Sequence, residues 1–102
     1  MIRGTTPTLT FTLPIQADTI TLLNIAFSQR RRIVFEKRLA DVETYDNTIK
    51  VTLSEVETLK LMSDGSDVEI QLRVGVGDGR LASEIFRVSV DRVLKDGLLN
   101  EL

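Results

Sequence analysis

Residues 68–79 read VEIQLRVGVGDG, and apolar and polar side chains alternate through the first nine of them. Successive side chains of a β-strand point to opposite faces of a sheet, so this pattern predicts a strand with one buried face. Gly77-Asp78-Gly79 follows and tolerates positive φ, as a tight hairpin turn requires. We therefore predict a return strand over about residues 82–90. Its expected inward residues are Phe86, Val88 and Val90.

The same two-residue period recurs before this hairpin and predicts four more strands. Their expected inward positions are Leu9, Phe11 and Leu13; Leu23, Ile25 and Phe27; Ile33, Phe35 and Leu39; and Ile49, Val51 and Leu53. Lys37 interrupts the third of these faces, so we expect that strand to lie at a sheet edge or to fray toward its end. The short connection between the second and third strands predicts a hairpin.

The period changes after residue 53. Ser54-Glu55-Val56-Glu57 has the form of a capping box, in which the Ser54 hydroxyl accepts from the Glu57 N–H and the Glu57 carboxylate accepts from the Ser54 N–H. The residues expected to face the core from the following one or two helical turns are Val56, Leu59 and either Leu61 or Met62. Asp64-Gly65-Ser66 ends this segment.

Six strands and one short helical crossover near residues 54–62 predict an all-β fold, a small antiparallel β-sandwich. An immunoglobulin-like or fibronectin-like arrangement is the first choice, and a small open barrel is the second. Cysteine and tryptophan are absent, so the comparison with antibody domains concerns architecture alone. We expect one sandwich domain over residues 1–97 and an apolar tail over residues 98–102.

Histidine is absent as well as cysteine. Zinc sites built from these residues are therefore excluded, as are Ser-His and Cys-His nucleophilic mechanisms. Asp64 and Asp67 flank a glycine turn, but they lack the spacing of a calcium-binding EF-hand loop. Residues 75–79 resemble a phosphate loop, but a strand and not a helix is expected to follow them. We expect no enzymatic activity, no cofactor and no metal.

The net charge is −2, and acids and bases are mixed along most of the chain. Such a balance gives no steering toward nucleic acid or an anionic membrane. No apolar run approaches the roughly 20 residues that a membrane-spanning helix needs. Residues 1–7 lack the apolar core of a signal peptide. We expect synthesis in the cytoplasm, with neither a membrane nor a nucleic acid as partner.

Three features are candidates for protein contacts. Arg30-Arg31-Arg32 could meet an acidic surface or phosphate, although a solvated hairpin tip is the simpler interpretation because no aromatic residues accompany it. Tyr45, in a predicted polar loop, is the one aromatic residue outside the inward faces. The last candidates are the apolar tail residues Leu98, Leu99 and Leu102. They either fold back onto the domain's own sheet or dock on a neighbouring subunit.

The opening residues 1–14, MIRGTTPTLTFTLP, resemble the start of a family of small proteins encoded in phages and prophages of Firmicutes. Further similar stretches are NTIKVTL (47–53), ETLK (57–60), VEIQLRV (68–74), LASEI (81–85) and VLKDG (93–97). The resemblance implies a virion-structural or virion-associated protein of the head–tail connector, the tail or the capsid surface. It brings no catalytic residues, and Arg30-Arg31-Arg32 lies outside it.

The leading prediction is a non-enzymatic phage virion structural or assembly protein that acts through protein–protein contacts. Its expected partners are other phage structural proteins and further copies of itself in a homo-oligomer. Its expected location is the virion, after synthesis in the host bacterial cytoplasm. The alternative is a non-structural phage-encoded binding module, such as an inhibitor of a host protein. A third hypothesis, an enzyme, would need a deep pocket lined by close carboxylates.

Overall fold

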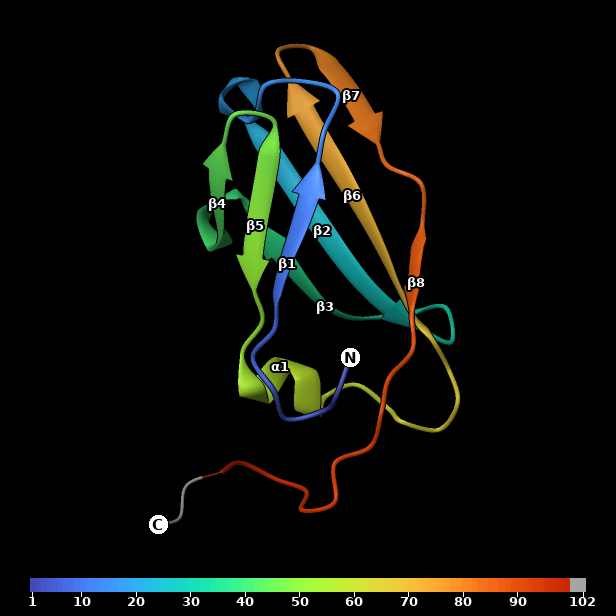
Figure 1. Cartoon of the computed structure of the whole chain (residues 1–102). Helices are drawn as coiled ribbons and strands as arrows, with labels where there is room; N and C mark the ends of the chain where they lie inside the picture. The colour runs from blue at the N-terminus through green and yellow to red at the C-terminus, as the bar shows by residue number, and fades with distance from the viewer. Residues whose placement is uncertain (100–102) are drawn as a thin grey trace.

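The computed structural model describes residues 1–99, and the strand predicted from residues 68–76 lies in the middle of its larger sheet (Figure 1). This sheet is antiparallel, with β2 and β6 as neighbours, β3 at the edge beside β2, and β7 and β8 both paired with β6. Its strands are β2 (Leu22–Gln29), β3 (Arg32–Arg38), β6 (Val68–Val76), β7 (Gly79–Ala82) and β8 (Phe86–Val88). The edge position of β3 confirms the prediction from Lys37.

A second antiparallel sheet of three strands packs against the first. Its order is β1 (Thr8–Thr12), β5 (Thr48–Thr52) and β4 (Val42–Tyr45). The short helix α1 (Glu55–Leu59) crosses from β5 to β6, and two 3-10 turns lie at Ala17–Thr19 and Leu39–Asp41. The largest side chains buried between the layers are those of Phe27, Ile25, Ile49, Leu53, Leu61, Ile70 and Leu72. The fold is the predicted small all-β sandwich.

The strand order is that of an immunoglobulin-like sandwich without its first strand. In that fold, strands A, B, E and D form one sheet and strands C, F and G form the other, which C′ can join beside C. With β1 taken as strand B, the two sheets read B-E-D and C′-C-F-G, and β7 and β8 share the place of G. Within residues 1–99, no strand occupies the place of A beside β1.

The helical crossover has the predicted capping box, but the prediction for one of its core residues is wrong. The Glu57 N–H donates to the Ser54 hydroxyl (3.1 Å), and the Ser54 N–H donates to the Glu57 carboxylate (2.8 Å). Thr58 and Leu61 are buried, whereas Val56 is half exposed. Residues three apart share a helix face and residues two apart do not, so the burial of Thr58 turns Val56 outward.

The third predicted strand also differs from its expected pattern. Phe35 is opposite Phe27, but Ile33 is opposite Ser28, so β3 contains one extra residue at Val34. A β-bulge of this kind moves the following side chains to the other face. Ile33 is therefore exposed, and Val34 packs against the core instead. Leu39 is partly buried but belongs to the 3-10 turn that follows the strand.

The predicted return strand over residues 82–90 is broken in two. The Ser83 N–H donates to the Leu72 carbonyl (2.9 Å), and the Ser83 hydroxyl accepts from the Leu72 N–H (3.0 Å). Because a side-chain oxygen takes the place of a backbone carbonyl, the regular ladder stops between β7 and β8. A further strand, β4, was not predicted, so residues 1–99 contain eight strands instead of six, and Tyr45 ends a strand instead of lying in a loop.

Candidate functional site

The arginine cluster expected from the sequence lies at the turn between β2 and β3. Arg30 and Arg31 are its two central residues, with φ of 51° and 64°. The Arg30 guanidinium forms an ion pair with Asp64 and donates to the Ser66 hydroxyl (3.1 Å). The Ser66 N–H and hydroxyl and the charge of Arg30 hold the pKa of Asp64 below its ordinary value. Arg30 therefore has a structural partner, whereas Arg31 and Arg32 are exposed.

The other predicted contact residues are exposed but lie elsewhere. Tyr45 is 77% exposed at the end of β4. Leu98 and Leu99 are 54% and 81% exposed, and the Leu99 N–H donates to the Glu55 carboxylate at the start of α1 (2.7 Å). These two side chains do not fold back onto the sheet, because the chain passes α1 instead. Leu102 lies outside the described residues.

The predicted contact residues do not form one surface (Figure 1). The β2–β3 turn lies beside the lower end of β8, and the end of β4 lies at the upper left of the molecule. The red segment that leads to Leu98 and Leu99 runs below α1. The described members of this set therefore do not form a single site within one copy of the chain.

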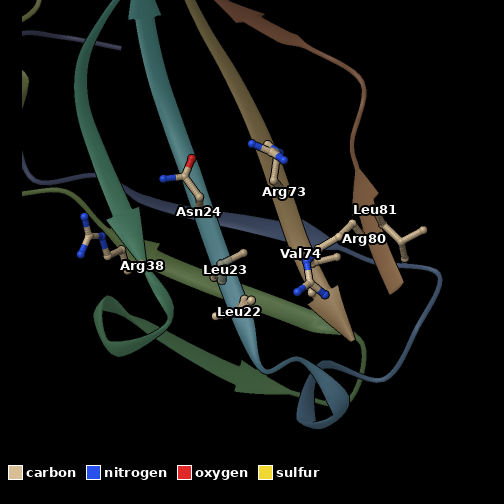
Figure 2. A pocket seen from close by; sticks show the side chains of 9 residues that line it. Leu22, Leu23, Asn24, Arg38, Arg73, Val74, Arg80 and Leu81 are labelled. Carbon is tan, nitrogen blue, oxygen red and sulfur yellow. The ribbon is translucent and has the colours of Figure 1, made fainter. Parts of the chain in front are cut away.

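The structure instead brings three other arginines together around a hollow of about 380 Å³ on the larger sheet (Figure 2). Four strands contribute to it. The lining residues are Leu22, Leu23 and Asn24 of β2, Arg38 of β3, Arg73, Val74 and Gly75 of β6, and Arg80 and Leu81 of β7. We call this surface the arginine hollow.

Strand register explains how the arginine hollow forms. Asn24 is opposite Arg38 on one side and Arg73 on the other, so these three side chains form a row across β3, β2 and β6. Gly75 is opposite both Leu22 and Arg80, which form the neighbouring row.

Gly75 leaves open the space between the two side chains of that second row. A Cβ atom at position 75 would lie 3.0 Å from the Leu22 Cβ and 3.2 Å from an Arg80 guanidinium nitrogen. Only a residue without a side chain allows both neighbours to approach this closely.

Positive charge dominates the rim of the hollow. No carboxylate belongs to its lining, and within residues 1–99 Arg38, Arg73 and Arg80 form no ion pair. Arg80 is held in place because its guanidinium donates to the Gly77 and Gly79 carbonyls (3.1 and 2.8 Å). Asn24 donates to the carboxylate of Glu36 (3.0 Å), which lies opposite Ala26, one row away from Arg38.

The floor and rim together suit recognition of an acidic surface. Leu22 shares its sheet face with Arg73 and Arg80 and is 55% exposed, so the arginines border uncovered apolar area. Guanidinium groups bind carboxylates through two parallel hydrogen bonds and stay charged at every physiological pH. For the same reason they cannot act as general bases.

The described part of the chain contains no cluster of three acidic side chains that could hold a metal ion. None of the helices within residues 1–99 has the length and apolar character that a membrane crossing requires. No family model, curated protein or solved structure matches the chain.

Proposed function

We propose that the protein is a non-enzymatic structural or assembly component of a phage particle and that it acts through protein–protein contacts. The arginine hollow carries this proposal. Interface centres are enriched in arginine and depleted of aspartate and glutamate, and the hollow combines Arg38, Arg73 and Arg80 with the exposed Leu22 and has no carboxylate in its lining. The resemblance to proteins of Firmicutes phages and prophages supports the phage setting.

The chemistry of the hollow favours a protein partner over a reaction. General acid–base catalysis needs a group that can donate or accept a proton near neutral pH, and arginine cannot do so. The hollow also lies on the face of a sheet and is lined by side chains that complement carboxylates. We therefore expect its partner to present aspartate or glutamate around an apolar centre, on another structural protein of the particle.

The test is incorporation of the double variant Arg38→Glu/Arg73→Glu into purified particles. Arg80 stays unchanged because it also stabilises the β6–β7 turn. Reversal of two charges at a contact with an acidic partner should lower the copy number per particle at least tenfold without loss of the fold. The matched control is Arg32→Glu, an exposed arginine on β3 outside the hollow, which should assemble normally. Quantitative mass spectrometry of particles and circular dichroism of the purified variants give the two readouts.

Two outcomes would overturn the proposal. Normal incorporation of the double variant would exclude the hollow as the contact surface. Absence of the wild-type chain from particles, together with capture of one stoichiometric host protein, would replace the structural role by that of an inhibitor of a host protein.

A further inference from the structure

Within residues 1–99, no strand forms hydrogen bonds with the backbone groups along the outer edge of β1. The Leu13 N–H donates to the Asn47 carbonyl (2.7 Å), and the Leu53 N–H donates to the Pro7 carbonyl (2.9 Å). The odd-numbered residues of this segment therefore direct their backbone groups toward β5. Because these groups alternate along a strand, those of Thr8, Thr10 and Thr12 point to the open side.

β1 also lacks the protection that the other sheet edges have. Proteins prevent edge pairing with charged residues, bulges and breaks. β3 has a bulge and several charges, β4 contains Glu43, and β7 and β8 are separated by Ser83 and contain Arg80 and Arg87. β1, in contrast, reads TLTFT without a charge or an irregularity.

The sequence of β1 is nearly the same in both directions around Thr10. In an antiparallel pair with a second β1, Thr10 would be opposite Thr10, Thr8 opposite Thr12, and Leu9 opposite Phe11. The three threonines of each strand contribute one N–H and one C=O each, so twelve groups would pair as six hydrogen bonds. A shift that placed Thr8 opposite Pro14 would lose a hydrogen bond, because proline has no backbone N–H.

We propose that two copies of the chain associate through their β1 strands, around a twofold axis at Thr10, and join their three-stranded sheets into one sheet of six strands. This dimer deepens the proposed assembly role by naming a second copy as a partner. It does not use the arginine hollow, so either proposal can fail without the other.

An apolar groove beside β1 supplies side-chain contacts for the same dimer. It has a volume of about 350 Å³, and residues of β1, β6 and β8 line it. Its apolar lining residues are Leu9, Phe11, Leu13, Ile70, Leu72, Phe86 and Val88. Phe11 and Phe86 contact each other across it, with ring centroids 5.8 Å apart. The pairing of Leu9 with Phe11 across the axis would cover the groove of each copy.

Charge and area both agree with a second copy as the occupant. β1 contains no charged residue, so its approach to an identical strand meets no like-charge repulsion along the edge. The strand is short, so we expect an interface near the lower limit of stable ones, about 1,200 Å² in total.

A single engineered cysteine tests the geometry directly. The natural chain has no cysteine, and Cα atoms of a hydrogen-bonded antiparallel pair lie about 5.5 Å apart, a distance that a disulfide spans. Under mild oxidation, the full-length variant Thr10→Cys should therefore form a covalent dimer at concentrations where the wild type dimerises. The matched control Thr52→Cys, on the central strand β5, should stay monomeric. Non-reducing electrophoresis and mass spectrometry give the yield.

Sedimentation of unlabelled protein gives the second readout. Thr10→Lys places two like charges opposite each other at the axis and should weaken the dimer at least tenfold, whereas Thr52→Lys should leave it unchanged. A wild-type chain that stays monomeric up to about 1 mM would overturn the dimer, as would failure of Thr10→Cys to cross-link. If removal of residues 98–102 abolished the dimer and Thr10→Lys did not weaken it, the contact would be assigned to the tail instead. The variant Arg38→Glu/Arg73→Glu should dimerise normally, because the proposed dimer interface does not include the arginine hollow.

Discussion

Glu57 caps the start of the helix and also connects the helix to the larger sheet. Its carboxylate accepts from the Ser54 N–H (2.8 Å) and forms an ion pair with Lys37 on β3 (2.7 Å). Both partners of this pair are mostly buried, with side chains 18% and 13% exposed. Partial burial raises the pKa of Glu57, but the hydrogen bonds from Lys37 and Ser54 and the charge of Lys37 outweigh it. The pKa therefore lies below its ordinary value.

The lowered pKa predicts a pH-dependent contribution to stability. The unfolded chain binds the proton of Glu57 more readily, so the contribution is complete above the ordinary pKa of glutamate, about 4.3, and decreases as the pH falls through the lower folded-state value. Glu57→Gln keeps an acceptor for the capping box but cannot ionise. We expect it to lower the free energy of unfolding by about 1 kcal/mol at pH 7, and by less at pH 3. Urea denaturation across this range measures the difference. A difference that does not change with pH would contradict the prediction.

Gln29 shows how much the two-residue period of a strand can predict about a single buried polar residue. It occupies the inward position that follows Leu23, Ile25 and Phe27, and it is buried. Its amide donates to the Met62 and Ser66 carbonyls (2.8 and 3.2 Å) and accepts from the Met62 N–H (2.8 Å). The period of the strand could have placed this side chain inward. Its partners could not be predicted, because they come from a loop more than thirty residues away.

At the scale of elements, the β2–β3 turn is strained at both central residues. Two-residue hairpin turns of this type need positive φ at both positions, for which Asn-Gly is the preferred pair. Arg30 and Arg31 adopt these angles instead, although non-glycine residues there cost roughly 1–2 kcal/mol each. Arg30 has its contacts with Asp64 and Ser66 in compensation, whereas the side chain of Arg31 is exposed.

Relief of this strain should stabilise the protein. In Arg31→Gly, the removed strain of 1–2 kcal/mol exceeds the added entropy of the unfolded chain, so we expect a net gain of roughly 0.5–1 kcal/mol. Arg31→Ala removes the same charge but keeps the strain, so it should give no gain. Thermal unfolding of the three proteins compares them. Equal stabilisation by both variants would instead assign the effect to the loss of charge.

Alternating hydrophobicity identified β1, β2, β5 and β6, because each has a continuous apolar face toward one core. It failed where the geometry depends on a partner strand. The bulge at Val34 is set by pairing with β2, and the break after Ala82 is set by the bonds between Ser83 and Leu72. β4 was missed because its burial is slight, with Val42 as its only partly buried residue.

At the scale of the whole molecule, Arg3 connects the N-terminal segment, the helix and the C-terminal segment. Its guanidinium donates to the Leu61 and Leu59 carbonyls (2.6 and 2.9 Å) and forms an ion pair with Asp96 (2.7 Å). A backbone bridge between Ile2 and Asp91 lies in the same region. These contacts include residues up to Asp96, but the side chains of Leu98 and Leu99 stay exposed.

Removal of residues 98–102 should therefore leave the fold nearly unchanged. The exposed leucines contribute little burial, so we expect the free energy of unfolding to change by less than about 0.5 kcal/mol. Arg3→Met should cost more, roughly 1–3 kcal/mol, because the half-buried carbonyls of α1 lose their charged donor. Chemical denaturation measures both. A large loss of stability on truncation would show that the tail contributes to the core.

The arginine hollow could not be predicted from the sequence because it depends on how the strands of the whole molecule pair. Arg38, Arg73 and Arg80 lie on three different strands, and only the registers of β3, β2, β6 and β7 bring them together. The outward position of Arg73 followed from the strand pattern. Gly75 was the other available signal, since glycine in a strand marks a close approach.

The pairing of β1 with β5 also determines how the chain must fold. Thr8 and Thr52 lie opposite each other but 44 residues apart, so β1 has no partner until β5 has been synthesised. At translation rates of about 5–20 residues per second this interval lasts roughly 2–9 s. Hairpins such as β2–β3 close within microseconds, whereas β1 must wait for a long loop to close. During synthesis, neighbouring nascent chains on one messenger would thus present the same uncharged strand to each other, and pairing between them would compete with folding of each chain.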